Sequence, residues 1–320
     1  MHPDSLAAIA EEYYEWMQVT NYSERTIQNC RRNLGYFFTW CEERGLLRPA
    51  DVTKPIVERY QRHLFYYRQQ RTGQPLTPGS QQVRLTAIRT FFKWLARKNY
   101  VLYNPAGDLY MPRAEHRLPH QSLTLAEVER VLSQPDLKTN TGIRDRAILE
   151  TFYSTGIRRL ELIKLTVYNV DLERETLFIC QGKGKKDRML PIGTRALDWI
   201  EQYLYDIRPQ YVVPPDQGCL FLTRWGGPFS INTLSYMVKR HLQNANINKQ
   251  GSCHLFRHTM ATLMLENGAD IRYIQQMLGH AAIESTKVYT QVSIRTLKAV
   301  HSQTHPASYK PRSKRKSKYR

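Results

Sequence analysis

The stretch from residue 105 to residue 119 divides the chain, because it interrupts every apolar periodicity on either side of it. Three prolines and a glycine lie in it: Pro105, Gly107, Pro112 and Pro119. Proline removes a backbone donor and disfavours helix in the residue before it. A chain of 320 residues is also longer than one average domain. We therefore expect two domains, residues 1–112 and residues 124–305, joined by a linker over residues 113–123.

The first domain has the apolar spacing of a helical bundle. Apolar residues recur at i, i+3 and i+4 in four stretches, which predict helices near residues 6–17, 24–44, 54–70 and 80–98. Basic side chains lie between the apolar stripes: Arg25, Arg31, Arg32, Arg84, Arg89 and Lys93. Most such charges face solvent, but a bundle that lies along a duplex would place some of them on phosphates.

The second domain combines helices with one strong strand signal. Thr124 and Glu127 have the spacing of a capping box at the start of a helix. Residues 176–180 and 188–192 are short apolar runs on either side of a glycine-rich polar loop, which is typical of a β-hairpin. Further helices are expected near residues 147–152, 158–165, 194–206, 231–245, 254–267, 270–278 and 284–291. The fold class predicted is mainly α with a small β-sheet.

The charge of the chain favours a polyanionic partner. Its 47 Lys and Arg exceed its 28 Asp and Glu, for a formal net charge of +19, and such a field attracts nucleic acid. Residues 306–320 form a basic tail that lacks the apolar residues for a core, so we expect it to be disordered when free. The tail is interpreted either as a solvated end or as an extra contact to phosphate.

Cysteine usage and hydropathy indicate a cytoplasmic protein. Five cysteines without paired metal spacing argue against a disulfide framework. No apolar run of 18 residues exists, and the start of the chain lacks the pattern of a signal peptide. We expect no membrane partner.

The residues that carry chemistry are arginines, histidines and a tyrosine near the C-terminal end. Four segments contain them: Gly156-Ile157-Arg158, His254-Leu255-Phe256-Arg257-His258, Leu278-Gly279-His280 and Tyr289. A phenol has a pKa of about 10, so it attacks a phosphodiester only where cations favour the phenolate and a neighbour takes its proton. Two arginines offer forked donors to the phosphoryl oxygens, on which negative charge develops. This composition predicts an enzyme that cuts DNA.

These segments resemble the tyrosine recombinase and integrase family. The similarity rests on order and spacing in Gly156-Ile-Arg158-Arg-Leu-Glu161-Leu, Gly182-Lys183-Gly-Lys-Lys-Asp-Arg188, His254-Leu-Phe-Arg257-His258 and Leu278-Gly-His280 ahead of Tyr289. It covers residues 120–300 strongly. The helical front half is similar in type to the core-binding domain that closes around DNA. The resemblance thus implies an N-terminal helical core-binding bundle and a C-terminal mixed α/β catalytic domain.

Position by position, the resemblance implies a role for each matching residue. Arg158, Arg257, His254 and His280 would bind the scissile phosphate, Lys183 would protonate the leaving 5′ oxygen, and Tyr289 would be the nucleophile. Glu161 has the spacing to hold the Arg158 guanidinium. The resemblance also implies a tetramer, of this chain alone or with a related recombinase, on double-stranded DNA with inverted half-sites. No cofactor, metal or ATP is expected. Ile294, Leu297 and Val300 form a short apolar stripe, which would dock on a neighbouring protomer.

Other interpretations of the same residues remain. Taken alone, the spacing of Arg158 and Glu161 favours a surface ion pair, and Lys183 could be a basic hairpin tip that only touches phosphate. The apolar stripe of Ile294, Leu297 and Val300 could equally pack on its own domain. His254 and His258 have the spacing of a zinc pair, but Leu255 stands where the metalloprotease pattern needs glutamate. A type IB topoisomerase-like enzyme and a non-catalytic DNA-binding regulator are the alternative functions. Leu160 and Phe256 depart from the residues common in the family, although neither replaces a reacting group.

Overall fold

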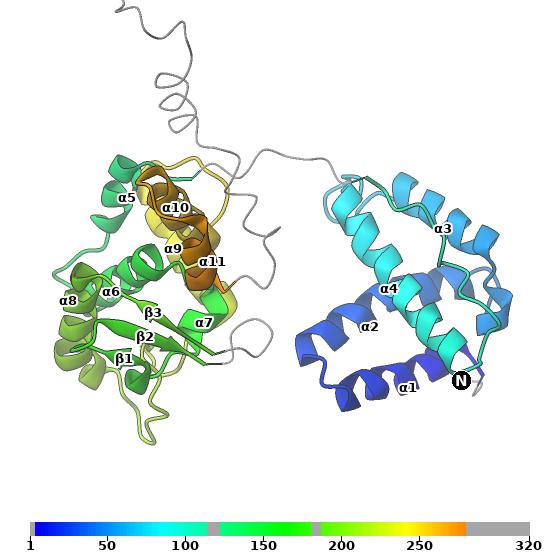
Figure 1. Cartoon of the computed structure of the whole chain (residues 1–320), viewed down its shortest axis with the longest axis horizontal. Coiled ribbons are helices and arrows are strands. Elements are labelled where there is room, and N and C mark those ends of the chain that lie inside the picture. The colour runs from blue at the N-terminus through cyan, green and yellow to red at the C-terminus, as the bar shows by residue number, and fades with distance from the viewer. Residues whose placement is uncertain (1–3, 114–121, 181–186, 280–320) are drawn as a thin grey trace, which may run out of the picture. The chain divides into compact units, whose positions relative to one another are not determined.

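The computed structural model describes residues 4–113, 122–180 and 187–279. The chain packs as two compact units, Met1–Arg117 and Leu118–Arg320 (Figure 1). Each has its own hydrophobic core. Within the described residues, no helix combines the length and the apolar composition that crossing a membrane requires.

The N-terminal unit is a bundle of helices with an aromatic core. Its elements are α1 (Leu6–Val19), α2 (Glu24–Glu42), the short η1 (Pro49–Asp51), α3 (Lys54–Tyr66) and α4 (Pro78–Arg97). Ser5, Ser23 and Thr77 cap α1, α2 and α4 by accepting a backbone N–H three residues on. Phe37, Phe91 and Phe92 are fully buried, and edge-to-face contacts join Phe37 to Phe92 and Phe91 to Phe92. The predicted bundle is confirmed.

The α3 helix is shorter than its apolar pattern predicts. It ends at Tyr66 instead of residue 70, and the chain then doubles back so that Arg68 bridges to Pro75. The backbone N–H of Gln69 donates to the Gln74 carbonyl at 3.0 Å. Gly73 supplies the turn with a φ of +67°, a conformation that glycine adopts without strain. Turn chemistry therefore overrides the helical pattern in this segment.

Several basic residues of the bundle are engaged within the fold. Arg89 donates to the carbonyls of Ala106 and Leu109 at 3.0 and 2.6 Å, so it fixes the segment after α4. Arg31 pairs with Glu11 at 2.7 Å on the exposed surface. Most of these charges were expected to face solvent, and Arg89 is one that does not.

The C-terminal unit surrounds a small sheet with helices. The helices are α5 (Leu125–Leu132), α6 (Asn140–Thr155), α7 (Arg159–Ile163), α8 (Thr194–Gln202), α9 (Ile231–Asn244), α10 (Cys253–Glu266) and α11 (Ile271–Leu278), with short turns η2 (Val167–Asn169), η3 (Tyr203–Ile207) and η4 (Arg208–Gln210). The predicted capping box is present, since Thr124 accepts from the Glu127 N–H at 3.2 Å and Glu127 accepts from the Thr124 N–H at 2.7 Å.

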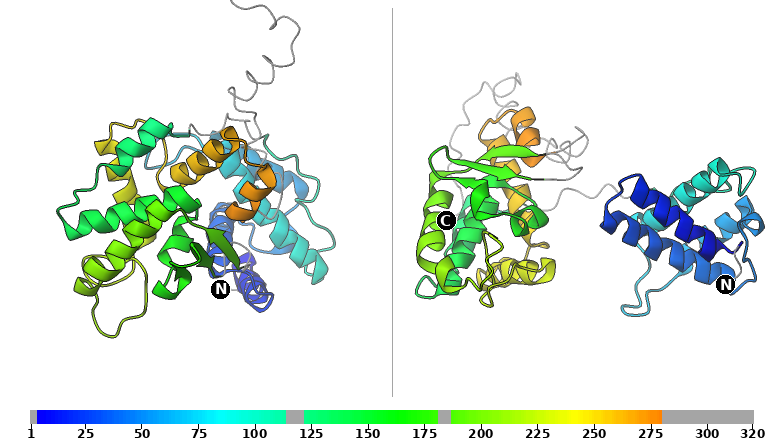
Figure 2. Two further views of the ribbon diagram at one scale, coloured as in Figure 1. Left: turned by 60° about the vertical axis from the view of Figure 1, so that its left-hand side comes forward. Right: turned by 90° about the horizontal axis from the view of Figure 1, so that it is seen from below.

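Three antiparallel strands form the sheet, and the two predicted strands are confirmed. The strands are β1 (Val170–Asp171), β2 (Thr176–Ile179) and β3 (Arg188–Pro191), in the order β1-β2-β3 (Figure 1). Figure 2 shows the same sheet, in green, from two further sides. Thr176 pairs with Pro191 and Ile179 with Arg188. The additional strand β1 has two residues, too few for an alternating pattern to indicate it.

Helix α6 passes through the core of this unit, and its acidic side chains are matched by cations. Asp145 is 1% exposed and accepts from Arg144, from Arg240 and from Nε2 of His241. Buried carboxylates are stable only where donors replace the lost water. The contacts to Arg240 and His241 hold the first half of α6 against α9.

Candidate active site

The turn after α6 begins the site. Helix α6 ends at Thr155, and Gly156 follows as its left-handed cap with a φ of +60°. A Cβ at Gly156 would lie 2.2 Å from the Cε atom of Met260, which belongs to α10. Glycine adopts this left-handed conformation without strain, and any larger residue would also require the flexible end of the Met260 side chain to move. The turn places Arg158 at the start of α7.

Arg158 is held by Glu161 through both its backbone and its side chain. The Arg158 backbone N–H donates to Oε2 of Glu161 at 2.8 Å, and its Nη1 donates to Oε1 at 2.9 Å. Glu161 is buried, whereas the Arg158 side chain keeps 19% of its surface exposed. The predicted contact between the two side chains is therefore confirmed, and it is a partly buried pair.

A third residue, Arg188, completes this cluster and was given no role on sequence grounds. Its Nη1 and Nη2 donate to the two oxygens of Glu161 at 3.0 and 2.7 Å. Burial alone would raise the pKa of Glu161, but hydrogen bonds from Arg188 and from the Arg158 backbone outweigh it and lower that pKa to about 2. Glu161 is consequently a carboxylate at any physiological pH.

Arg257 comes from α10 and is buried. Its Nη1 donates to the Gly156 carbonyl at 2.7 Å, and its Nη2 donates to the Leu278 carbonyl at 2.6 Å. Arg257 thus joins the turn after α6 to the end of α11, across 101 and 21 residues of sequence respectively. Around it, Met260, Ile274 and Leu278 pack as a small apolar cluster between α10 and α11.

Three arginines meet at the C-terminal end of α11. Arg188 Nε donates to the Met277 carbonyl at 3.1 Å, and Arg257 donates to the Leu278 carbonyl. Arg158 Nη2 donates to the Gly279 carbonyl at 3.3 Å. The last carbonyls of a helix carry partial negative charge and lack partners within the helix. The end of α11 therefore brings the guanidinium groups of Arg158 and Arg257 to one place.

His254 lies on the exposed side of the first turn of α10. Partial desolvation, followed by the positive charges of Arg159, Arg257 and Arg158, lowers the pKa of its imidazole. The neutral ring is consequently favoured near pH 7, in a form that either accepts a proton or donates one hydrogen bond. His258 follows one turn later and is half-buried.

The arrangement of Arg158, Arg257 and His254 is suited to an anion. No group of three or more His, Cys, Asp or Glu residues within residues 4–113, 122–180 and 187–279 has the geometry to hold a metal ion. Two arginines and a histidine instead present donors in a partly buried setting, where their attraction for an oxyanion is stronger than in water.

The other predicted site residues, Lys183, His280 and Tyr289, lie outside the described residues. The stripe of Ile294, Leu297 and Val300 and the basic tail also lie outside them. Sequence alone links His280 directly to the end of α11, since it follows Gly279. Arg188 was missed because its position at the end of a basic run is typical of a loop residue; its only distinguishing signal is that the apolar strand pattern starts there.

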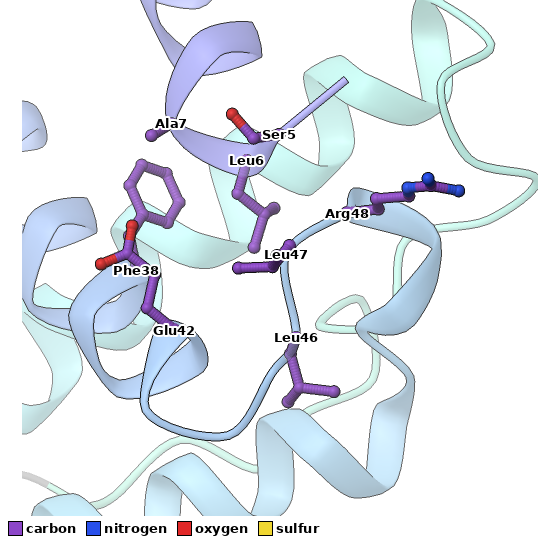
Figure 3. A pocket seen from close by; sticks show the side chains of 8 residues that line it. All are labelled: Ser5, Leu6, Ala7, Phe38, Glu42, Leu46, Leu47 and Arg48. Carbon is purple, nitrogen blue, oxygen red and sulfur yellow. The ribbon is translucent and has the colours of Figure 1, made fainter. Parts of the chain in front are cut away.

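A separate cavity of about 290 Å³ lies in the N-terminal unit, between the start of α1 and the end of α2. Its lining is mainly apolar, with Leu6, Phe38, Leu46 and Leu47 around it (Figure 3). Ser5, Glu42 and Arg48 also line it, but it contains none of the predicted site residues. We interpret it as a packing defect of the bundle and not as the functional site.

Comparison with known proteins places both units in one family. Residues 121–295 match the phage integrase family, and residues 9–101 match the N-terminal SAM-like domain of phage integrases. Tyrosine recombinase XerC 2 of Ralstonia nicotianae is 49% identical over 94% of this chain and 86% of its own length. Tyrosine recombinase XerD of Pseudomonas putida is 35% identical over 89% of this chain and 92% of its own length.

Solved structures share the fold. The XerH site-specific recombinase bound to a palindromic difH substrate has a TM-score of 0.69 at 20% identity, over 87% of this chain and 79% of that one. The Tn1549 transposon integrase bound to circular-intermediate DNA has a TM-score of 0.70 at 17% identity, over 91% and 98% of the two chains.

Proposed function

The chain belongs to the phage integrase family and is a tyrosine recombinase of the Xer type, and on that premise we propose how its residues cut and rejoin DNA at specific sites. Tyr289 is the nucleophile, and Arg158, Arg257, His254 and His280 bind the scissile phosphate. Lys183 is the general acid. Site-specific recombination is the function, and the residue roles and the order of events are the proposal.

The chemical step exchanges one phosphodiester for another. The Tyr289 phenolic oxygen bonds to phosphorus while the bond to the 5′ oxygen breaks, so the phosphate stays on the 3′ side as a phosphotyrosyl ester. The phenolic proton leaves through a histidine, and Lys183 gives a proton to the departing 5′ oxygen. A 5′ hydroxyl from a partner strand reverses these bonds. No ATP is consumed, because the protein–DNA ester preserves the bond energy.

One observation carries this proposal: Arg257 and Arg158 donate to adjacent carbonyls, those of Leu278 and Gly279. Two guanidinium groups from distant segments are thereby gathered beside the residue that precedes His280. Such a pair is suited to the two non-bridging oxygens of one phosphate. His254 adds a neutral imidazole near the same arginines.

The proposal extends to the partners of the reaction. We propose a tetramer, of this chain or with a related recombinase, that holds two duplexes with inverted half-sites and passes through a Holliday junction. Support comes from the palindromic substrate of the XerH structure. The reaction serves integration, excision or resolution of DNA, on a chromosome or a mobile element. We place the protein in the cytoplasm, where its five free thiols would persist.

Covalent trapping tests the proposal. A duplex selected by the wild-type chain from a random-sequence pool is labelled and nicked beside the scissile phosphate, so that the cut fragment diffuses away. The wild-type chain should form a covalent protein–DNA band, and Tyr289→Phe should form none. Tyr273→Phe is the matched control, because Tyr273 is an exposed tyrosine of α11 and should leave the band unchanged. Salt-dependent binding without any band would instead support a non-catalytic DNA-binding protein.

Strand exchange separates recombination from relaxation. Two labelled duplexes of different length that carry the same site should yield joined products of new length. A type IB topoisomerase-like enzyme would relax a supercoiled circle and give no such product.

A further inference from the structure

Arg188 makes three side-chain hydrogen bonds beside the site. It begins β3, opposite Ile179 of β2, and its side chain is only 11% exposed. Both ends of its fork bind the Glu161 carboxylate, at 3.0 and 2.7 Å, while Nε binds the Met277 carbonyl at 3.1 Å. One side chain therefore ties the sheet to α7 and to the end of α11.

The oxygens of Glu161 are shared between two arginines. Oε1 accepts from the side chains of both Arg158 and Arg188, and Oε2 accepts from Nη2 of Arg188 and the backbone N–H of Arg158. Without Arg188, the carboxylate would lose half of these donors and would be held by Arg158 alone. The guanidinium of Arg158 would then lose its fixed support.

The second contact of Arg188 acts on the same arginine from the other side. A Cβ atom on Gly279 would lie 3.1 to 3.2 Å from the Nε, Cδ and Cζ atoms of Arg188, so the guanidinium packs directly on this glycine. The Gly279 carbonyl in turn accepts from Arg158. Arg188 thus supports both acceptors that orient Arg158, namely the Glu161 carboxylate and the Gly279 carbonyl.

We propose that Arg188 is a positioning residue for the cleavage reaction, which fixes the Arg158 guanidinium through Glu161 and the end of α11. This inference rests on the proposed function. Because Nε, Nη1 and Nη2 of Arg188 all donate within the protein and its side chain is only 11% exposed, it acts through Arg158 and does not bind the phosphate itself. A direct donor contributes a factor of about 10² to 10³ in rate, and an indirect one contributes less.

The test compares two versions of one nicked duplex, selected from a random-sequence pool as above. One carries the normal scissile phosphate, and the other carries a methylphosphonate, in which a methyl group replaces one non-bridging oxygen. The methylphosphonate has no negative charge for Arg158 to stabilise, so misplacement of the Arg158 guanidinium should slow its cleavage less than it slows cleavage of the normal phosphate. Single-turnover cleavage rates are measured for the wild-type chain, Arg188→Ala, Arg188→Lys and Arg158→Ala.

On normal phosphate, Arg188→Ala should cleave about 10- to 100-fold more slowly than wild type. Arg188→Lys should recover part of that loss, since one ammonium cannot replace a fork. On methylphosphonate, the gap between wild type and Arg188→Ala should shrink to a few-fold, as the gap for Arg158→Ala does. The ratio of the two rates is independent of the folded fraction of a preparation, because both substrates are tested on the same protein.

Arg195→Ala is the matched control. Arg195 also bridges two carboxylates, those of Glu129 and Glu150, but it lies on α8 and should leave both rates unchanged. An equal gap on the two substrates would show that Arg188 only supports the fold, and a wild-type rate for Arg188→Ala would show that Arg158 does not need it; either result overturns this inference alone. Absence of covalent product with the wild-type chain would overturn the proposed function as well.

Discussion

Glu161 of α7 and Arg188 of β3 form a two-point ion pair across 27 residues of sequence, with Nη1–Oε1 at 3.0 Å and Nη2–Oε2 at 2.7 Å. The pair closes a chain of contacts that runs from the sheet through α7 to the end of α11. Its charges are almost fully shielded from water, with 11% and 6% of the two side chains exposed. Partial burial makes such a pair sensitive to the loss of either partner.

The first prediction concerns the pH dependence of stability. The pKa of Glu161 is lowered from 4.5 to about 2 in the folded chain, so the folded state favours the carboxylate. The contribution of the Glu161 carboxylate to the free energy of unfolding is fully present above about pH 5 and is lost as the pH falls from about 4.5 to 2. Glu161→Gln should therefore reduce the free energy of unfolding at pH 7 by at most about 3 kcal/mol, and by much less at pH 3. Urea unfolding of Glu161→Gln and of the wild-type chain at pH 7 and pH 3 measures this difference. An equal loss of unfolding free energy at the two pH values would contradict the prediction.

The second prediction concerns the turn at Gly156. An alanine there would meet Met260 at 2.2 Å and would hold a φ of +60°, so Gly156→Ala should destabilise the chain by about 1 to 3 kcal/mol. Adding Met260→Ala should relieve the clash but not the backbone strain. Gly227→Ala is the control, since no atom lies within 4 Å of its Cβ position. Equal melting temperatures for Gly156→Ala and Gly227→Ala would contradict the account of this turn.

The third prediction concerns His254. Desolvation and then the charges of Arg159, Arg257 and Arg158 lower its imidazole pKa. Arg159→Ala removes one of these charges and should raise the His254 pKa, because the protonated ring then meets less repulsion. An NMR titration of the imidazole protons measures the shift. Arg174→Ala, at an exposed arginine paired with Asp171, is the control and should leave the His254 pKa unchanged. An unchanged His254 pKa in Arg159→Ala would contradict the claim that the charge of Arg159 lowers it.

The fourth prediction concerns the buried charge cluster on α6. Asp145 is 1% exposed and accepts from Arg144, which is 7% exposed. Asp145→Asn would leave a buried guanidinium without its counter-charge and should cost about 3 to 5 kcal/mol of stability. Asp171→Asn breaks an exposed pair at 3.8 Å and should cost less than about 1 kcal/mol. Chemical denaturation of both variants measures the two losses of unfolding free energy. Similar losses would show that the buried cluster around Asp145 stabilises the chain no more than an exposed ion pair does.

Much of the fold was accessible from local patterns. The apolar spacing predicted the bundle helices, and the Thr124–Glu127 capping box and the hairpin of β2 and β3 were also predicted. The short turn at 67–76 was missed, because the pattern of α3 continues in the sequence beyond Tyr66, where the bridge between Arg68 and Pro75 ends the helix.

The site was accessible only in part. Arg158, His254 and Arg257 were predicted as site residues from the motifs that contain them, and this remains a prediction. The Arg158–Glu161 contact followed from i,i+3 spacing and is present in the structure. The proposed role of Arg188 and the meeting of the three arginines at the end of α11 depend on contacts across as many as 121 residues. No local pattern encodes such contacts, since they arise from how α7, β3, α10 and α11 pack.

The most direct test of the central claim is to identify the residue joined to DNA after cleavage. Trypsin cuts after Lys287 and Arg295, so Tyr289 lies in the peptide 288–295, which contains one tyrosine. After nuclease trimming, mass spectrometry of the trapped complex should find the residual nucleotide on Tyr289. A nucleotide on any other residue would contradict the proposed mechanism.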